Sequence, residues 1–247
     1  MSDKYRVAVW YSVWGDLKYL SHRDTMRLWQ MALVRARIPV YYSEGFNPHP
    51  RISLPLPRSV GMSSECELLL LDLEGNCDIE SCRVGFYPTR FSASVWNPSR
   101  LQRQLPRGMD IFAAWHVPSK TRAVPQWAEY RITLSNEVDR SVLGSRIEHF
   151  LQAPTWPLWR AARGRHPRRL LDLRADVTDL KLNGQSLQCT IAVKPSGTPR
   201  IDEVLTALEI NMPDAASEIC REAVGYPGVL TGDGWQRLMY TSGDGIS

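Results

Sequence analysis

The stretch that decides the fold is Cys66–Leu73 (CELLLLDL), which is the clearest β-strand in the sequence. A short apolar run of this kind is typical of a buried strand. Upstream, Tyr5–Tyr11 alternates β-forming side chains and predicts a second strand. Between these strands, Ser21 is a helix N-cap with Asp24 three residues later as its capping-box partner. Apolar side chains then recur at helical spacing until Pro39 ends the helix.

The remaining predicted strands and helices complete one order of elements in the first half of the chain and repeat that order in the second half. The first half is expected to add short extended segments over 40–43 and 51–56, a helix over 100–105 and a strand over 109–116. The second half is expected to have strands over 129–134, 156–161, 170–173, 177–182, 187–193 and 236–241, and helices over 141–151, 199–208 and 215–223. The order predicts an α+β fold of two tandem ferredoxin-like (β-α-β-β-α-β) halves with antiparallel sheets. We expect an N-terminal domain over 1–125 and a C-terminal domain over 126–247, joined at a proline-containing linker.

Length and composition narrow the protein class. The chain has 247 residues, of which 43% are apolar, and this is enough to bury a core without disulfides. No apolar run is long enough to span a bilayer, and the N-terminus lacks a secretory signal. Five cysteines fit a reducing compartment better than a disulfide framework. We therefore expect a cytoplasmic protein without a membrane partner.

Positive charge is concentrated in the middle of the chain. Residues 100–174 carry 14 basic and 6 acidic side chains, although the whole chain has a net charge of only +4. Arginine dominates the basic residues, and its planar fork matches phosphate and stacks on bases. This distribution favours a polyanion partner such as RNA, with solvated surface arginines as the alternative.

The densest basic segment is 160–169, between two predicted strands. A loop with this composition suits contacts to phosphates, which give affinity with little sequence selectivity. Trp156 and Trp159 lie just upstream and could stack on bases, or could belong to the core. We assign RNA or anion contacts here to five arginines, namely Arg160, Arg163, Arg165, Arg168 and Arg169.

A second group of polar residues lies in the first third of the chain. His22 and His49 are candidate general acid–base groups, because histidine titrates near neutral pH. Ser21, Arg23 and Arg51 are candidate anion contacts. The chemistry requires that the start of the helix and the loop around His49 meet, which a β-α-β unit does not guarantee; otherwise both histidines are ordinary surface residues.

The cysteine spacing argues against a metal site. Cys66, Cys77 and Cys82 lack the C-x2-C spacing of zinc ligands and the close triplet of a radical-SAM iron–sulfur cluster. The sequence also lacks phosphate-loop, nucleophile-elbow and zinc-protease motifs. We therefore expect no metal and no cofactor.

Two stretches in the first third of the chain, 15–24 (GDLKYLSHRD) and 42–53 (YSEGFNPHPRIS), form a specific motif. With this motif the chain resembles the radical-SAM-linked protein family, a domain of unknown function fused to or encoded beside radical-SAM proteins and in some genomes beside ribonuclease E/G. The later segments 171–174 and 194–205 are also similar to that family, whereas 76–96 departs from it. The resemblance implies RNA modification or processing, with tRNA or rRNA as the ligand and a radical-SAM protein or ribonuclease E/G as a partner. The motif positions that carry it are Gly15, Asp16, Tyr42, Ser43, Gly45, Phe46, Asn47 and Pro48.

The sequence leaves three functions open. The leading hypothesis is an RNA-associated accessory protein that supports a radical-SAM partner and is not itself catalytic. The first alternative is a metal-independent endoribonuclease that uses His22 or His49 as general acid or base, with Arg23 or Arg51 on the scissile phosphate. The second alternative is a protein adaptor that does not bind RNA.

Overall fold

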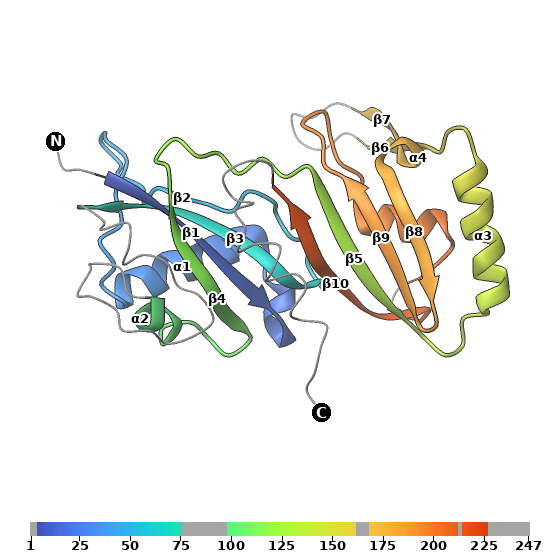
Figure 1. Ribbon diagram of the computed structural model, residues 1–247, viewed down its shortest axis with the longest axis horizontal. Helices are drawn as coiled ribbons and strands as arrows, with labels where there is room; N and C mark the ends of the chain where they lie inside the picture. The colour runs from blue at the N-terminus through green and yellow to red at the C-terminus, as the bar shows by residue number, and fades with distance from the viewer. Residues whose placement is uncertain (1–3, 76–97, 162–167, 212–213, 227–247) are drawn as a thin grey trace. The chain divides into compact units, whose positions relative to one another are not determined.

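The computed structural model describes residues 4–75, 98–161, 168–211 and 214–226 (Figure 1). Contacts divide these residues into two compact units, and the division falls between Val124 and Pro125. Unit 1 contains the described residues up to Val124 together with Tyr226, and unit 2 is Pro125–Gly225. Both units are mixed α+β structures whose paired strands are antiparallel.

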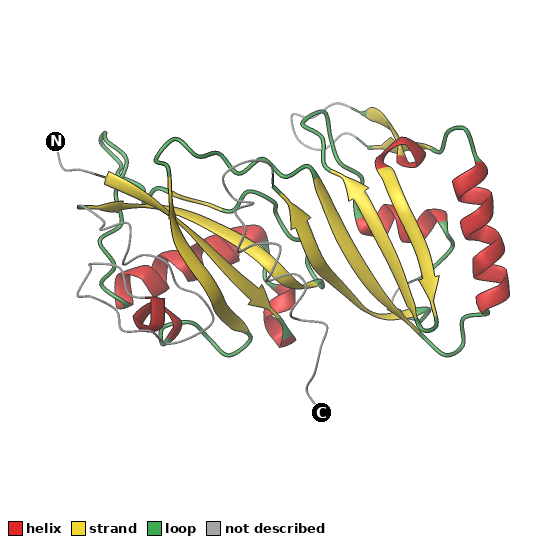
Figure 2. Cartoon of the chain, viewed as in Figure 1, coloured by secondary structure: helices red, strands yellow, loops and turns green. Residues whose placement is uncertain are grey.

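The sheet of unit 1 is built on its first strand. That strand pairs on one side with the predicted strand around Cys66–Leu73 and on the other with the last strand of the unit, so the order is β4-β1-β3, with β2 on β3 (Figure 2). The elements are β1 (Lys4–Val13), the 3-10 helix η1 (Gly15–Tyr19), α1 (His22–Arg35), β2 (Ile52–Ser53), β3 (Ser63–Glu74), α2 (Pro98–Gln102) and β4 (Met109–Val117).

One helix supplies most of the helical side of the unit 1 core. The Ser21 hydroxyl accepts a hydrogen bond from the Asp24 backbone N–H at 3.2 Å and donates to its carboxylate, as the capping pattern predicts. From α1, Trp29 reaches the sheet, where its ring packs edge-to-face on Tyr11 with centroids 4.8 Å apart. Both side chains are buried, so this contact fixes α1 against β1.

The sheet of unit 2 has the strand order β10-β5-β9-β8. Strands β5 and β9 alternate buried and partly exposed residues along their length, so one face of the sheet is buried and the other is polar. Figure 2 shows a short helix crossing behind two of these strands. The elements are β5 (Trp127–Leu134), α3 (Arg140–Gln152), β6 (Pro157–Arg160), β7 (Arg169–Asp172), α4 (Leu173–Asp176), β8 (Val177–Asn183), β9 (Ser186–Ala192), α5 (Ile201–Ala207) and β10 (Ala216–Gly225).

The two units share one strand order when each is numbered separately. Counted from the start of each unit, the main strands lie across the sheet in the order fourth, first, third, second. In unit 1 these are β4, β1, β3 and β2, and in unit 2 they are β10, β5, β9 and β8. Unit 2 adds a two-stranded hairpin, β6–β7, between its first helix α3 and its second main strand β8. This hairpin carries the basic segment that the sequence singles out.

Two of the predicted elements are wrong. The helix expected over 215–223 is the strand β10, which pairs along its length with β5. Alanine, glutamate and arginine favour a helix locally, but pairing in the sheet overrides that preference. Residues 40–43 form only the isolated bridges Val40–Leu73 and Tyr42–Pro50, because the prolines nearby lack the N–H donor that a strand needs.

Several expectations fall outside the described residues. These are the final strand over 236–241, the segment 76–96 that departs from the family pattern, and the tip of the basic loop, which contains Arg163 and Arg165. Within the described residues, no helix has the length and apolar character needed to cross a membrane.

Candidate functional site

The basic hairpin of unit 2 is attached to the start of α5 by Arg160. Its Nε donates to Glu203 Oε1 at 2.9 Å and its Nη2 donates to Glu203 Oε2 at 2.5 Å. The same Nη2 also donates to the Thr198 carbonyl at 3.1 Å. Both side chains are largely buried, with 19% and 15% of their surface exposed. Arg160 therefore holds the hairpin in place, and its charge is compensated by Glu203.

The loop 194–200 before α5 is the other half of this arrangement. Arg169 donates to the Ser196 carbonyl at 2.9 Å, and its guanidinium lies so close to Gly197 that a Cβ there would be 2.7 Å from it. Gly197 also has a φ of +129°, which suits glycine alone. At the start of the loop, Lys194 pairs with the nearly buried Asp176 of α4. The later family segment 194–205 is thus bonded to residues on either side of the other one, 171–174.

One exposed cation of the hairpin, Arg168, lies over an aromatic ring. The Arg168 guanidinium carbon lies 4.3 Å from the centroid of the Trp159 ring, and 56% of Trp159 is exposed. Among the described residues, Arg168 has no carboxylate partner. Trp156 differs, because its ring packs on Phe150 and His149. Of the two tryptophans, Trp159 is available to a ligand and Trp156 packs on α3.

The segment 171–174, at the end of the hairpin, has a structural use in this fold. Asp172 Oδ1 accepts from the backbone N–H groups of Trp156 at 2.8 Å and Arg174 at 3.1 Å, which closes the base of the hairpin. Arg174 donates from Nε to the Leu151 carbonyl at 2.9 Å, near the end of α3, and from Nη1 to the Val177 carbonyl at 3.2 Å. It satisfies the Leu151 carbonyl, which lies in the last turn of α3 and has no partner within the helix.

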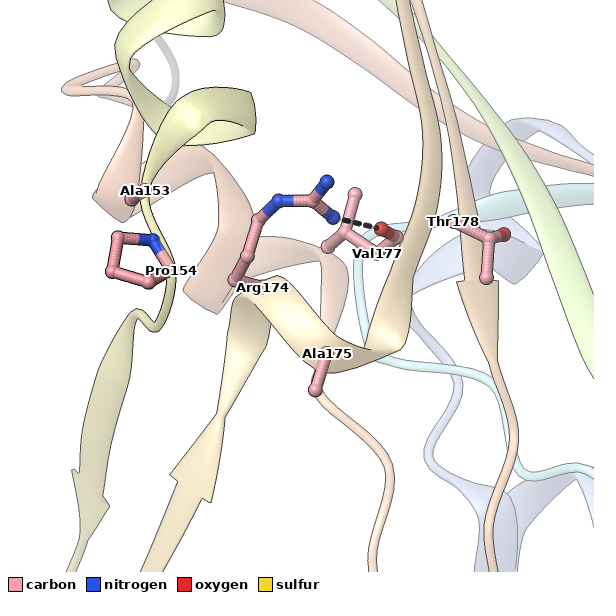
Figure 3. A pocket seen from close by; sticks show the side chains of 6 residues that line it. All are labelled: Ala153, Pro154, Arg174, Ala175, Val177 and Thr178. Atoms are coloured by element: carbon pink, nitrogen blue, oxygen red, sulfur yellow. Dashed lines mark hydrogen bonds between the residues drawn. The ribbon is translucent and has the colours of Figure 1, made fainter.

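A pocket of about 430 Å³ lies beside Arg174 (Figure 3). Its charged lining residue is Arg174, and the figure shows the guanidinium bonded to the Val177 carbonyl. Because Nε and Nη1 already bond backbone carbonyls, the pocket offers a ligand no charged group beyond the remaining N–H groups of Arg174. Its lining residues are Ala153, Pro154, Arg174, Ala175, Val177 and Thr178.

In unit 1, the start of α1 is held by the segment before β3. Arg58 donates to the carbonyls of Lys18 at 2.7 Å and Leu17 at 3.1 Å, and the Gly61 N–H donates to Lys18 at 2.8 Å. This fixes η1, which contains the motif positions Gly15 and Asp16. His22 and Arg23 follow Ser21 in the first turn of α1 and are exposed.

The loop 42–50 forms the second part of the family motif and is closed at its base. The Ser43 N–H donates to the His49 carbonyl at 2.8 Å, and the His49 N–H donates to Ser43 Oγ at 2.9 Å. Gly45 has a φ of +122°, in the region that favours glycine. The closure leaves the loop's tip, including Phe46, Asn47 and Pro48, exposed.

The two candidate catalytic histidines lie at opposite ends of α1. His22 is its first residue, whereas the chain leaving its last turn reaches Val40 beside Leu73 and then the loop that contains His49. Fourteen residues at about 1.5 Å each separate the helix ends by roughly 20 Å. The structure does not bring His22 and His49 together, because α1 runs back along the sheet between them.

Buried thiols and metal ligands offer no alternative chemistry in the described part of the chain. Cys66, Cys189 and Cys220 are buried, and burial, with a smaller contribution from Asp179, raises the pKa of Cys189 to about 12. Such a thiol is a poor nucleophile at neutral pH. No group of three His, Cys, Asp or Glu side chains among these residues is arranged to hold a metal ion.

Sequence reasoning missed the residues that orient the candidate arginines. Glu203, which fixes Arg160, also accepts from the Arg200 N–H at 2.7 Å, so its position three residues after the helix start was a usable signal. Tyr41 carries the cations of Lys4 and Arg51 over its ring at 5.2 and 5.6 Å. Nothing in the local sequence indicates that second arrangement, which depends on β1 lying near the loop.

A comparison with known families matches residues 6–90 and 93–203 to one family, described as uncharacterized proteins conserved in bacteria (DUF2344). The chain belongs to that family. The match covers the Ser21 cap, the loop 42–50, the basic hairpin and Glu203, so DUF2344 includes the site regions of both units. The description names no radical-SAM protein or ribonuclease, and that part of the resemblance stays a prediction. No curated protein matches the chain.

Proposed function

We propose that this protein is a cytoplasmic RNA-binding accessory protein. It binds the phosphate backbone of structured RNA with the β6–β7 hairpin. The observation that carries the proposal is Arg168, a guanidinium that has no carboxylate partner in the described part of the chain and lies over the exposed Trp159 ring. A stacked guanidinium loses less side-chain freedom on binding a phosphate, because the ring already restricts it. Tight attachment of the hairpin through Arg160 and Arg169 adds to this rigidity.

The sequence supplies further charge at the same place. Arg163 and Arg165 lie between β6 and β7, so one short connection contains several arginines. Phosphate contacts of this kind give affinity that falls as salt rises, and they do not distinguish base sequence. Structured RNA such as tRNA or rRNA presents closely spaced phosphates that suit them.

The polar face of the unit 2 sheet is a less suitable RNA surface. Burial raises the pKa of Glu129, and the neighbouring carboxylates of Glu222 and Asp179 raise it further. Arg131 and Lys181 pair with two of these three carboxylates, so the five groups together keep a negative charge that disfavours phosphate, whereas the hairpin is positive. This contrast favours the hairpin as the contact surface.

We further propose that each unit is a ferredoxin-like half. The support is the shared order of four strands with antiparallel neighbours and a helix in each of the two long connections. The presentation of bound RNA to a radical-SAM protein or to ribonuclease E/G rests on the family resemblance. Co-purification from cells tests it, and recovery of bound RNA with neither partner would contradict it.

The RNA proposal is tested by the binding of the full-length protein to bulk tRNA and rRNA fragments across a salt series. We expect binding at low salt that weakens as salt rises. Arg168→Ala should weaken it by several-fold and lower the salt dependence by about one phosphate contact. The matched control is Arg107→Ala, which removes a guanidinium 5.8 Å from the Trp14 ring in unit 1 and should leave binding unchanged. No binding at low salt would overturn the proposal.

The endoribonuclease alternative gains no support from the site geometry. A general acid and a general base must both reach the scissile phosphate, and the length of α1 lies between His22 and His49. Each histidine would have to act without the other. We therefore do not propose cleavage as the function.

A further inference from the structure

The loop 42–50 occupies the same place in unit 1 that the basic hairpin occupies in unit 2. Each follows the first helix of its unit, α1 or α3, and precedes the second main strand, β2 or β8. Unit 2 fills this connection with β6, β7 and α4, and unit 1 fills it with the loop. The side chains that the loop exposes can therefore be compared with those of the hairpin.

The loop presents one aromatic side chain without cover. Phe46 is 110% exposed, more than any other large hydrophobic residue among those described, and Tyr42 at the loop's base is 43% exposed. A fully exposed Phe side chain contributes nothing to the free energy of folding, because it buries no apolar surface. The hydrogen bonds between Ser43 and His49 and the Tyr42–Pro50 bridge nevertheless hold the loop closed beneath it.

The surroundings of the loop are basic. Lys4 and Arg51 lie over the Tyr41 ring, at the base of the loop, and both are exposed. Arg35 and Arg37 lie at the end of α1, on the segment that leads into the loop. Of the residues that the structure describes, Glu44 and Glu74 are the exposed acidic ones near this end of the sheet, so the described cations outnumber the carboxylates. A protein partner that bound Phe46 in an apolar pocket would not require these cations. The phosphates of a nucleic-acid strand, in contrast, would pair with them.

We infer that the loop 42–50 is a second nucleic-acid site, in which Phe46 stacks on an unpaired base while Arg51 and Lys4 contact the adjacent phosphates. Combinations of an exposed aromatic ring with flanking cations bind single strands, because every base has a face on which a ring can stack. The site differs in ligand from the hairpin, which grips phosphates of structured RNA. RNA and DNA strands share this chemistry, and both are used as probes.

The test is the affinity of the full-length protein for fluorescein-labelled single strands of RNA and DNA about 12 nucleotides long, measured by anisotropy. Phe46→Ala should weaken binding by about 5- to 150-fold, the equivalent of one lost base stack. Phe46→Trp should bind at least as tightly as the natural protein. Phe46→Leu should bind as weakly as Phe46→Ala, because leucine keeps apolar bulk but has no aromatic face.

The matched control is Tyr19→Ala, which removes an aromatic side chain that is 60% exposed on η1, at the other end of α1. It should leave single-strand affinity unchanged. Binding of structured RNA by Phe46→Ala should also stay within about twofold of the natural protein, which separates this site from the hairpin. The inference is overturned if Phe46→Ala binds single strands like the natural protein, or if Phe46→Leu restores binding, since an apolar pocket would accept leucine.

Discussion

The first helix-to-strand connections of the two units differ in what they leave exposed. In unit 2, the arginines are placed by acceptors, and the exposed Trp159 ring is occupied by Arg168. In unit 1, the loop 42–50 exposes the bare ring of Phe46, and the cations lie on a separate ring, Tyr41. The same position in one strand order therefore holds a cationic surface in one unit and an aromatic one in the other.

Each connection is nevertheless next to a partly buried ion pair. In unit 1, Arg6 bonds Asp72 at 2.6 and 3.0 Å, and the backbone of Asp72 bonds Tyr41 and Arg51 on either side of the loop. In unit 2, Arg160 bonds Glu203. Removing one member of such a pair leaves the other charge uncompensated, so both pairs are expected to matter more for stability than for ligand contact.

The largest effect is expected at Asp72, whose side chain is only 3% exposed. Asp72→Ala leaves Arg6 partly buried without its carboxylate, and the free energy of unfolding should fall by about 3 kcal/mol. Urea denaturation of the natural protein and the variant gives this difference. A loss below about 1 kcal/mol would mean that water compensates Arg6, and that the loop does not depend on this pair.

A smaller loss is expected for Glu203→Ala, because the Glu203 side chain is more exposed than that of Asp72, at 15% against 3%. The free energy of unfolding should fall by about 1–2 kcal/mol. Affinity for structured RNA should not fall with it at low temperature, since the change frees a cation. A loss of RNA affinity in the folded variant would show that hairpin placement matters more than its charge.

Removal of the ring beneath Arg168 tests whether stacking organises the phosphate contact. Trp159→Ala should weaken binding of structured RNA by about 1 kcal/mol, or about fivefold, while Arg168 keeps its charge. Trp14→Ala is the matched control in unit 1, where the ring lies under Arg107. Equal affinity of Trp159→Ala and the natural protein would reduce Arg168 to an ordinary surface charge.

The smallest effect concerns pH and Glu129. Because burial and nearby carboxylates raise its pKa in the folded state, the folded protein binds more protons than the unfolded chain above about pH 4.5. Glu129 therefore contributes a decrease in stability as pH rises through the range between its unfolded and folded pKa. Glu129→Gln should reduce that decrease, as measured by thermal unfolding between about pH 4 and 7, and should leave RNA affinity unchanged. A steeper decrease in the variant would contradict this sign.

Local signals in the sequence were sufficient for the main elements. The cap at Ser21 and the apolar run 66–73 each specify their structure through neighbouring residues. The strand β10 was missed because its composition also suits a helix and only pairing with β5 decides between them. The charge distribution along the sequence indicated that the hairpin is basic. It did not indicate which of the arginines are fixed by acceptors and which are exposed.

The candidate site depended on contacts that sequence cannot supply. Arg160 and Arg168 have the same side chain and lie in the same basic segment, yet one is fixed by Glu203, 43 residues away, and the other lies on Trp159. Similarly, His22 and His49 belong to one family motif, and α1 separates them. Sequence spacing identified the chemical groups, and the tertiary fold determined which groups could act together.

The most direct test compares two variants on two ligands. The affinities of Arg168→Ala and Phe46→Leu are measured for structured RNA and for an unpaired RNA strand, relative to the natural protein. We predict opposite selectivity, in which Arg168→Ala loses mainly structured-RNA affinity and Phe46→Leu loses mainly single-strand affinity. Equal changes on both ligands, or no change in either variant, would contradict the assignment of two kinds of contact to the two connections.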